Sequence, residues 1–317
     1  MVPSLPFEHE RDLIADDAAV IYTHRPWTEL PKLLSLHNPG QVWYSPDCIV
    51  IHQGSRSFYL IHYSATKRVL KARETTEQLG IKPGWSVGSC ARRIWQWIGH
   101  TQTFNRHARQ WVQPGWHFLA CKPGRYDTAA LYDIRSAYYT LLTYANGLEV
   151  YPTKTGIEWA VCSGKAWERF QQALNAVWHN KPLRNSLVGT AWGGDGIATA
   201  WCRGKRIQIP MKPGPLRPLA ALIVRSTFEL CAEAFTQTNA VYAHTDCVIT
   251  PSGTPPQCWT AHGLDYKTEA TGQTDIVACG VYHVGEKATL WWNKGARWPL
   301  PIQPPPLPKH LLHHDWL

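Results

Sequence analysis

Two aspartates of the 317-residue chain follow short apolar runs, at points where a carboxylate could hold a cation. Asp133 comes directly after TAALY, which predicts a strand, and Asp246 lies in the polar centre of AVYAHTDCVIT, which predicts a hairpin. Adjacent antiparallel strands would bring the two carboxylates together, where they repel each other unless a cation lies between them. Oxygen ligands of this kind suit Mg²⁺. A lone aspartate at a strand end usually serves as a cap or a turn residue, so each segment by itself indicates little.

A third polar segment lies between the two aspartates. Lys181 and Asn185 are four residues apart in KPLRNSLVG, and Pro182 is typical of the first turn of a helix, so we expect a helix to begin here. The preceding segment, Lys165 to about His179, predicts another helix, because its apolar residues share one face and Ser163 could cap its start.

Other elements must position these segments. The apolar runs Ile49–Ile51 and Phe58–Ile61 predict strands, and Ser86–Trp97 predicts a helix with a serine-rich start. A longer helix is expected from Pro218 to about Gln237, just before the predicted hairpin. The proline-rich end, from Trp298 onward, predicts an extended strap on the surface.

The composition indicates a folded chain with a polyanionic partner. Hydrophobic residues make up 44% and charged residues 17%, which is typical of globular proteins. The 32 Lys and Arg residues against 23 Asp and Glu give a net charge of +9, which favours nucleic acid, although a merely basic surface has the same balance. The nine cysteines form no C-x-x-C pair, so we expect free thiols in a cytoplasmic protein of a bacterial or virus-infected cell. No signal peptide or membrane-spanning run is present, so no membrane partner is expected.

Taken together and in this order, the three segments resemble the motifs of family B DNA polymerases, including the phage and protein-primed branch. The family's motifs D-x-x-S-L-Y-P, K-x-x-x-N-S-x-Y-G and Y-x-D-T-D-S appear here as DIRSAYY, KPLRNSLVG and YAHTDC. CKPGR resembles a degraded Y-x-G-G turn, and LDYKTE resembles the W-K-x-E strand that follows the third motif. The resemblance covers roughly residues 86 to 284 and implies a template-directed DNA polymerase.

The resemblance implies a role for each matching residue. The catalytic pair would be Asp133 and Asp246, which would bind Mg²⁺, or Mn²⁺, for two-metal phosphoryl transfer. Incoming dNTPs would be bound by Lys181, Asn185, Tyr138, Ser136 and Arg169. Primer-template DNA would be contacted by Ser186, Gly189, Tyr282, Lys267 and Arg125, and replication accessory proteins would be further partners.

Several of these roles have a specific physical content. The ring of Tyr138 would pack under the sugar and exclude a 2′-hydroxyl, and the backbone amides of residues 134–137 would cradle the phosphates. Gly189 would let its helix approach the new base pair closely. Arg169 would be a second phosphate contact, or equally a solvated charge on its helix.

The resemblance also implies an α+β fold: a polymerase palm, formed by an antiparallel sheet with packed helices, short helical fingers, a reduced thumb and a small N-terminal domain. The expected division is an N-terminal region at 1–120, the first palm part at 121–162, fingers at 163–190, the second palm part with the metal hairpin at 191–262, and a reduced thumb with a proline-rich tail at 263–317. No exonuclease motif precedes Asp133, so we expect no proofreading.

Two positions depart from the family pattern. His244 stands where the third motif has its first aspartate, and imidazole, a softer ligand than carboxylate, would shift the preference toward Mn²⁺. Val188 replaces a tyrosine that lies against the minor groove, which predicts low fidelity. The alternative is a polymerase-fold nucleic-acid-binding protein whose catalysis has lapsed. The presence of Asp133, Lys181 and Asp246 favours the active enzyme.

Overall fold

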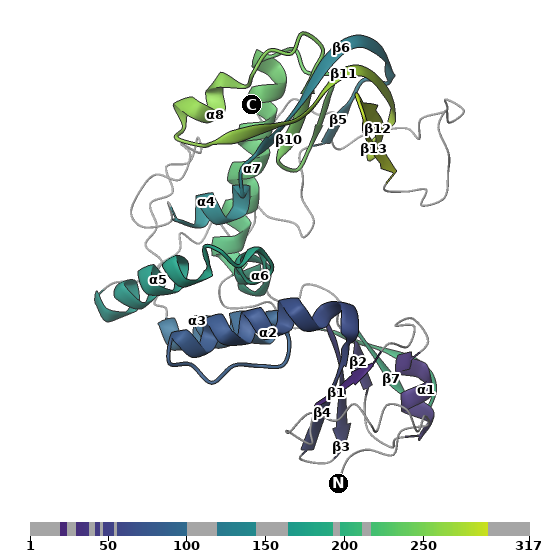
Figure 1. The fold of residues 1–317 in the computed structure, drawn as a ribbon, viewed down its shortest axis with the longest axis vertical. Coiled ribbons are helices and arrows are strands. Elements are labelled where there is room, and N and C mark those ends of the chain that lie inside the picture. Colours follow the sequence, from purple (N-terminus) through teal and green to yellow (C-terminus); the bar gives the residue numbers. More distant parts are fainter. Residues whose placement is uncertain are drawn as a thin grey trace. The chain divides into compact units, whose positions relative to one another are not determined.

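The computed structural model describes residues 20–23, 30–37, 42–44, 47–53, 56–99, 119–143, 164–192, 197–210 and 217–290. Helices are combined with two mostly antiparallel sheets, which confirms the expected α+β class (Figure 1). The chain divides into two compact units. Unit 1 comprises residues 1–103 and 160–220, and unit 2 comprises residues 104–159 and 221–317.

Unit 1 contains a six-stranded sheet in the order β1-β4-β3-β2-β7-β8. Its strands are β1 (Val20–Thr23), β2 (Val42–Tyr44), β3 (Cys48–Gln53), β4 (Arg56–His62), β7 (Ile197–Cys202) and β8 (Lys205–Pro210). The strands β3 and β4 contain the two strands predicted from sequence. Helix α1 (Leu30–His37) supplies Leu30 and Leu34 to the core formed with Val42, Ile49 and Leu60.

Strands β7 and β8 belong to this sheet, although they lie within residues 191–262, which were expected in the second palm part. β7 pairs with β2 through Val42 opposite Trp201, and β8 pairs with β7 along its whole length. An unpaired row of backbone groups on β2 would need a partner, and the later hairpin supplies it. The boundary expected at residue 191 therefore differs from the observed sheet membership.

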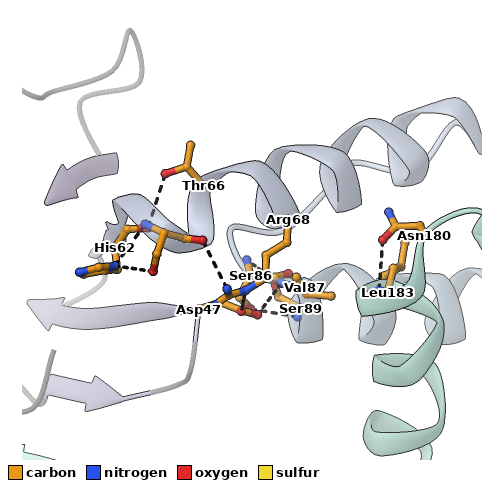
Figure 2. A network of polar contacts seen from close by, with 10 residues as sticks. Asp47, His62, Thr66, Arg68, Ser86, Val87, Ser89, Asn180 and Leu183 are labelled. Atoms are coloured by element: carbon orange, nitrogen blue, oxygen red, sulfur yellow. Dashed lines mark hydrogen bonds and ion pairs between the residues drawn. The ribbon is translucent and has the colours of Figure 1, made fainter. Parts of the chain in front are cut away.

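Four helices complete the described part of unit 1: α2 (Tyr63–Gln78), α3 (Val87–Ile98), α5 (Gly164–Val177) and α6 (Lys181–Trp192). The helix predicted at 86–97 is confirmed as α3, and Ser86 and Ser89 form a capping box at its start. Asp47 accepts hydrogen bonds from Arg68 Nε at 2.7 Å and from the Val87 amide at 3.3 Å, so it links α2 to the first turn of α3 (Figure 2).

The start of α6 is held by Asn180, whose side chain is buried. Its Nδ2 group donates to Lys71 O at 3.1 Å and to Thr75 Oγ1 at 3.0 Å, both on α2. Its Oδ1 atom accepts the Leu183 amide at 3.2 Å, as an N-cap does (Figure 2). One amide therefore caps α6 and joins it to α2, which sets the position of the helix that begins at Lys181.

Unit 2 contains a seven-stranded sheet in the order β13-β12-β11-β6-β10-β9-β5. Its strands are β5 (Leu119–Cys121), β6 (Gly124–Ile134), β9 (Tyr242–His244), β10 (Cys247–Thr250), β11 (Tyr266–Ala278), β12 (Val281–Val284) and β13 (Lys287–Leu290). The long central strands β6 and β11 pair with two register shifts, and such irregularities increase strand twist. The ring centres of Tyr242 on β9 and Tyr282 on β12 lie 4.8 Å apart, although three other strands lie between β9 and β12 in the sheet order. The sheet is therefore strongly curved.

The described helices of unit 2 are α4 (Ala137–Thr143), α8 (Gln257–Ala261) and α7 (Arg217–Gln237), of which residues 221–237 belong to this unit. Trp259 of α8 is fully buried, donates its indole N–H to Leu230 O of α7 at 3.0 Å and lies 6.1 Å from the Tyr266 ring of β11. The ring of Tyr132 on β6 completes this layer at 5.6 Å from Tyr266. Aromatic packing thus fixes α7 and α8 on one face of the sheet.

The structure confirms the predicted helices as α5, α6 and α7 and the predicted hairpin as β9–β10. The cap expected from Ser163 and the proline-rich end lie outside the described residues. Within the described helices, none combines the length and apolar character needed to cross a membrane.

We expect Asn180→Ala to lower the free energy of unfolding by about 2–3 kcal/mol, because it removes the cap on the Leu183 amide of α6 and the buried hydrogen bonds that join α6 to α2. Chemical denaturation followed by circular dichroism measures the change. The control is Asn175→Ala on exposed α5 surface, which should change stability by less than about 0.5 kcal/mol. Equal stability of the two variants would contradict the anchoring role of Asn180.

Candidate functional site

Asp246 is placed by the tight turn between β9 and β10. His244 is directly opposite Cys247, so Thr245 and Asp246 form a two-residue turn. Thr245 has a φ of 60°, a left-handed conformation that a threonine adopts at some cost. The turn presents Asp246 at the tip of the hairpin, as the sequence predicts.

Asp133 lies on the strand next to that turn. β6 pairs with β10 in a register that puts Asp133 opposite Cys247, the residue after Asp246. The Ile134 amide extends this pairing by donating to Asp246 O at 2.9 Å. The end of one strand and the tip of the hairpin therefore meet, although more than a hundred residues separate them in sequence.

The pKa values of two cysteine thiols are affected by the charges of Asp133 and Asp246. Burial and then the neighbouring thiol of Cys247 and carboxylate of Asp246 raise the pKa of Cys231 on α7, and Asp133 contributes too. Burial, followed by Asp246 and Asp133, likewise raises the pKa of Cys247. Both carboxylates thus act on both thiols, which places the two acids around one small region.

The same thiols are held as neutral donors. Cys231 Sγ donates to Thr245 O at 3.0 Å, and Cys247 Sγ donates to His244 O at 3.2 Å. Because their pKa values are raised, the sulfurs stay protonated and brace the hairpin turn. They are poor soft-metal ligands in this state.

Basic residues on β11 and β13 face the carboxylates. Lys267, opposite Asp133 in the β6–β11 register, places its Nζ 3.5 Å from Asp133 Oδ1 and also pairs with Glu269. Lys287 of β13 contacts the other oxygen of Glu269 at 2.6 Å. Lys267, expected to contact DNA, is therefore an ion-pair partner of a candidate metal ligand.

The segment after Asp133 carries Ser136 and Tyr138. Ser136 has a φ of 53° and accepts the Thr140 amide at 2.9 Å, so it starts helix α4. Tyr138 is half-buried, and burial and the Asp246 carboxylate raise the pKa of its hydroxyl. The hydroxyl of Tyr138 thus lies within the electrostatic reach of Asp246.

Fewer backbone amides can bind a phosphate than the expected set at residues 134–137. The Ile134 amide donates to Asp246 O and the Arg135 amide to Asp265 O at 2.8 Å. These two N–H groups maintain the hairpin and the adjoining loop, so they are not available to a ligand. What remains of the cradle is the start of α4.

The donor set fits a hard divalent cation only in part. Among the described residues, no cluster of three or more His, Cys, Asp or Glu side chains is arranged to hold a metal ion. Mg²⁺ nevertheless binds commonly through one or two carboxylates, with water and substrate phosphates completing its coordination. Asp133 and Asp246 supply that number of carboxylates.

In unit 1, helix α6 presents a polar stripe. Lys181, Asn185 and Gly189 are spaced at i, i+4 and i+8 and are all exposed, whereas Leu183 and Leu187 on the other side are buried. The Trp95 indole of α3 donates to Leu187 O at 2.9 Å, which fixes the rotation of α6. Apart from its own helix turn, a Cβ added to Gly189 would meet no atom of the described residues within 4 Å, so this position of the stripe has room for an external ligand.

Other residues near this stripe are committed to packing. Arg169 Nη1 donates to Trp97 O at 2.8 Å, and its guanidinium lies 5.3 Å from the Trp97 ring centre. It is neither a solvated charge nor an open phosphate contact in this structure. Ser186 is half-buried, and Val188 is buried at 5% exposure, so the expected effect of Val188 on fidelity has no exposed side chain to act through.

Two expected DNA contacts lie away from the carboxylates. Arg125 pairs with Asp275 at 2.8 Å near the opposite end of β6, eight residues from Asp133 or roughly 26 Å along a strand. Tyr282 is 6% exposed and packs in the sheet core against Tyr242. The expectation for Tyr282 is corrected: the register of β12 directs its ring inward.

Sequence reasoning missed Glu269, Cys231 and Asn180. Glu269 is part of LDYKTE, and its two-residue spacing from Lys267 was the available signal for a shared face. Cys231 is one of several apolar positions on a long helix, so nothing local distinguishes it. Asn180, just before the predicted helix start, was recognisable as a cap.

No family model and no curated protein matches the chain. Among solved structures, the fold is distantly similar to DNA polymerases. Phi29 DNA polymerase with primer-template DNA and incoming nucleotide substrates matches at a TM-score of 0.45 and 10% identity, over 74% of this chain and 70% of that one. The family B DNA polymerase of the hyperthermophilic archaeon Pyrobaculum calidifontis matches at a TM-score of 0.37 and 11% identity, over 67% of this chain and 34% of that one. The chain thus spans about a third of the archaeal enzyme.

We expect Lys267→Met to tighten Mn²⁺ binding about fivefold in the absence of DNA, because the ammonium group competes with a cation for Asp133. Titration followed by Mn²⁺ electron paramagnetic resonance measures the affinity. The control is Lys287→Met, because Lys287 forms its ion pair with Glu269, and this variant should change the affinity less. Weaker binding by Lys267→Met would contradict the competition.

Proposed function

We propose that the chain is a template-directed DNA polymerase that adds deoxynucleotides to a primer 3′-hydroxyl by two-metal phosphoryl transfer, without proofreading. One observation carries this proposal: Asp133 on β6 and Asp246 in the turn before β10 lie on neighbouring segments and act on the same two thiols, Cys231 and Cys247. Two carboxylates in such proximity favour a shared divalent cation.

The chain's own groups would divide the work. Asp133 and Asp246 would hold Mg²⁺ or Mn²⁺, which when bound neutralises phosphate charge and activates the primer hydroxyl. Tyr138, beside Asp246, would lie under the sugar of the incoming nucleotide and exclude a 2′-hydroxyl. Ser136, at the start of α4, would contact its phosphates.

Helix α6 would bind the triphosphate. Lys181 and Asn185 are exposed one turn apart, so an ammonium group and an amide point from the same stripe. A lysine is a common phosphate ligand, and an amide adds a directional hydrogen bond. Gly189, two turns further on, leaves room for a base pair or a DNA backbone to approach the helix.

A second candidate is a nucleic-acid-binding protein whose catalysis has lapsed. The ion pair between Lys267 and Asp133 favours it, because a built-in ammonium group neutralises a carboxylate without any metal. His244, where the third motif usually has an aspartate, favours it too. The retained Lys181, Asn185 and Asp246 favour the enzyme.

Primer extension separates the two candidates. Purified protein with primer-template DNA, dNTPs and Mg²⁺ or Mn²⁺ should extend the primer, and Asp133→Ala or Asp246→Ala should lower the rate by about 10³-fold, because several kcal/mol of charge stabilisation are lost. The matched control is Asp127→Ala, which removes an exposed aspartate from the same strand and should leave the rate unchanged. DNA binding without extension by the wild type would favour the lapsed protein.

The His244→Asp variant tests the role of the hairpin. An added carboxylate beside Asp246 should raise activity in Mg²⁺ relative to Mn²⁺ by severalfold, because Mg²⁺ prefers oxygen to imidazole nitrogen. Steady-state extension rates in each metal give the ratio. An unchanged ratio would show that position 244 has no influence on metal preference, and His283→Asp on β12 serves as the control.

A further inference from the structure

Cys121 and Cys279 lie together although they belong to distant strands. Cys121 ends β5 at one edge of the unit 2 sheet, and Cys279 lies in the turn between β11 and β12. Cys121 is directly opposite Tyr242, and the Tyr242 hydroxyl accepts the Gly280 amide at 2.9 Å. Tyr242 therefore joins the β5 edge to the β11–β12 turn, and this brings Cys121 and Cys279 close to each other.

The two thiols are hydrogen-bonded to each other, and both residues are partly exposed. The hydrogen bond from Cys121 lowers the pKa of Cys279, whereas the same contact and burial raise the pKa of Cys121. Cys279 is therefore the thiol that ionises more readily, and Cys121 keeps its proton. Since the thiolate is the nucleophile, Cys279 is the sulfur that reacts first.

The other thiols of the described residues are placed differently. Burial raises the pKa of Cys90, Cys231, Cys247 and Cys258, which favours the protonated thiol in each. Cys48 is buried, and Cys202 is half-buried on β7 in unit 1. A low-pKa thiol with a second thiol in contact is the arrangement that oxidants select.

We propose that Cys121 and Cys279 form an oxidative modification site at which a hydroperoxide drives closure of a reversible disulfide between β5 and the β11–β12 turn. The Cys279 thiolate attacks one peroxide oxygen, the O–O bond breaks, and hydroxide leaves, which gives a sulfenic acid. The Cys121 sulfur then attacks the Cys279 sulfur, the S–O bond breaks, and water leaves with the Cys121 proton. The hydroxide from the first step takes up the proton that Cys279 lost on ionising, so the two sulfurs are oxidised and one molecule of hydrogen peroxide is reduced to two waters.

The disulfide would clasp the curled sheet. It would connect the edge strand β5 to the turn that follows β11. In the sheet order, three strands lie between β5 and β11: β9, β10 and β6. Asp133 and the hairpin that ends in Asp246 belong to the same sheet, so the disulfide would restrain the strands that position the two carboxylates. This inference rests on the contact between the two thiols and on their environment, and it requires no polymerase activity.

The test is treatment of the full chain with stoichiometric hydrogen peroxide, followed by non-reducing digestion and mass spectrometry. We expect a cross-linked peptide joining Cys121 to Cys279, the loss of those two thiols, and recovery of both with dithiothreitol. In Cys121→Ser, Cys279 should stop at the sulfenic acid, which dimedone captures. Cys202→Ser is the matched control and should form the cross-link at the wild-type rate.

The outcomes are distinguishable from a loss of folding. Circular dichroism melting of Cys121→Ser and Cys279→Ser shows whether each variant is folded before oxidation, and dimedone labelling of folded Cys121→Ser supports Cys279 as the nucleophile. The proposal is overturned if peroxide leaves both thiols free in the wild type. It is also overturned if Cys202 reacts first, or if Cys279 joins Cys162, which lies outside the described residues.

Discussion

The backbone pairing of β6 with β10 is the constraint on which the candidate centre depends. Its register puts Asp133 opposite Cys247, and the Ile134 amide continues the ladder to Asp246 O. Two like charges are thereby held close by hydrogen bonds that do not involve either side chain. Lys267 pairs with Asp133 and with Glu269, and Lys287 pairs with Glu269, so ammonium groups lie beside this strand end as well as carboxylates.

In each unit, buried contacts fix the orientation of the polar residues proposed to bind ligands. In unit 1, Asn180 caps α6 and the Trp95 indole fixes the rotation of that helix, so the stripe of Lys181, Asn185 and Gly189 faces outward. In unit 2, the packing of Trp259 and Tyr266 holds the helices against the sheet that carries the aspartates. Functional side chains on helix and strand ends are positioned more precisely than those on long loops.

The cysteines show how environment alone gives one residue type several chemistries. Cys231 and Cys247 donate to backbone carbonyls of the hairpin, and burial among carboxylates keeps them neutral. Cys279 accepts a hydrogen bond from a second thiol, which stabilises its anion. Desolvation therefore dominates in the first case and a specific donor in the second.

The sequence by itself determined the elements that depend on short-range interactions. The hairpin at 242–250, the capped start of α3 and the start of α6 at Lys181 follow from turn, capping and proline chemistry, and the meeting of a strand end with a hairpin tip was expected from motif order. Only the tertiary structure decided which strands became neighbours. It assigned β7 and β8 to the N-terminal sheet, paired Lys267 with Asp133 and directed Tyr282 into the core. The physical reason is that register across distant strands depends on burial of the whole sheet, and a shift of one residue reverses the face of every side chain.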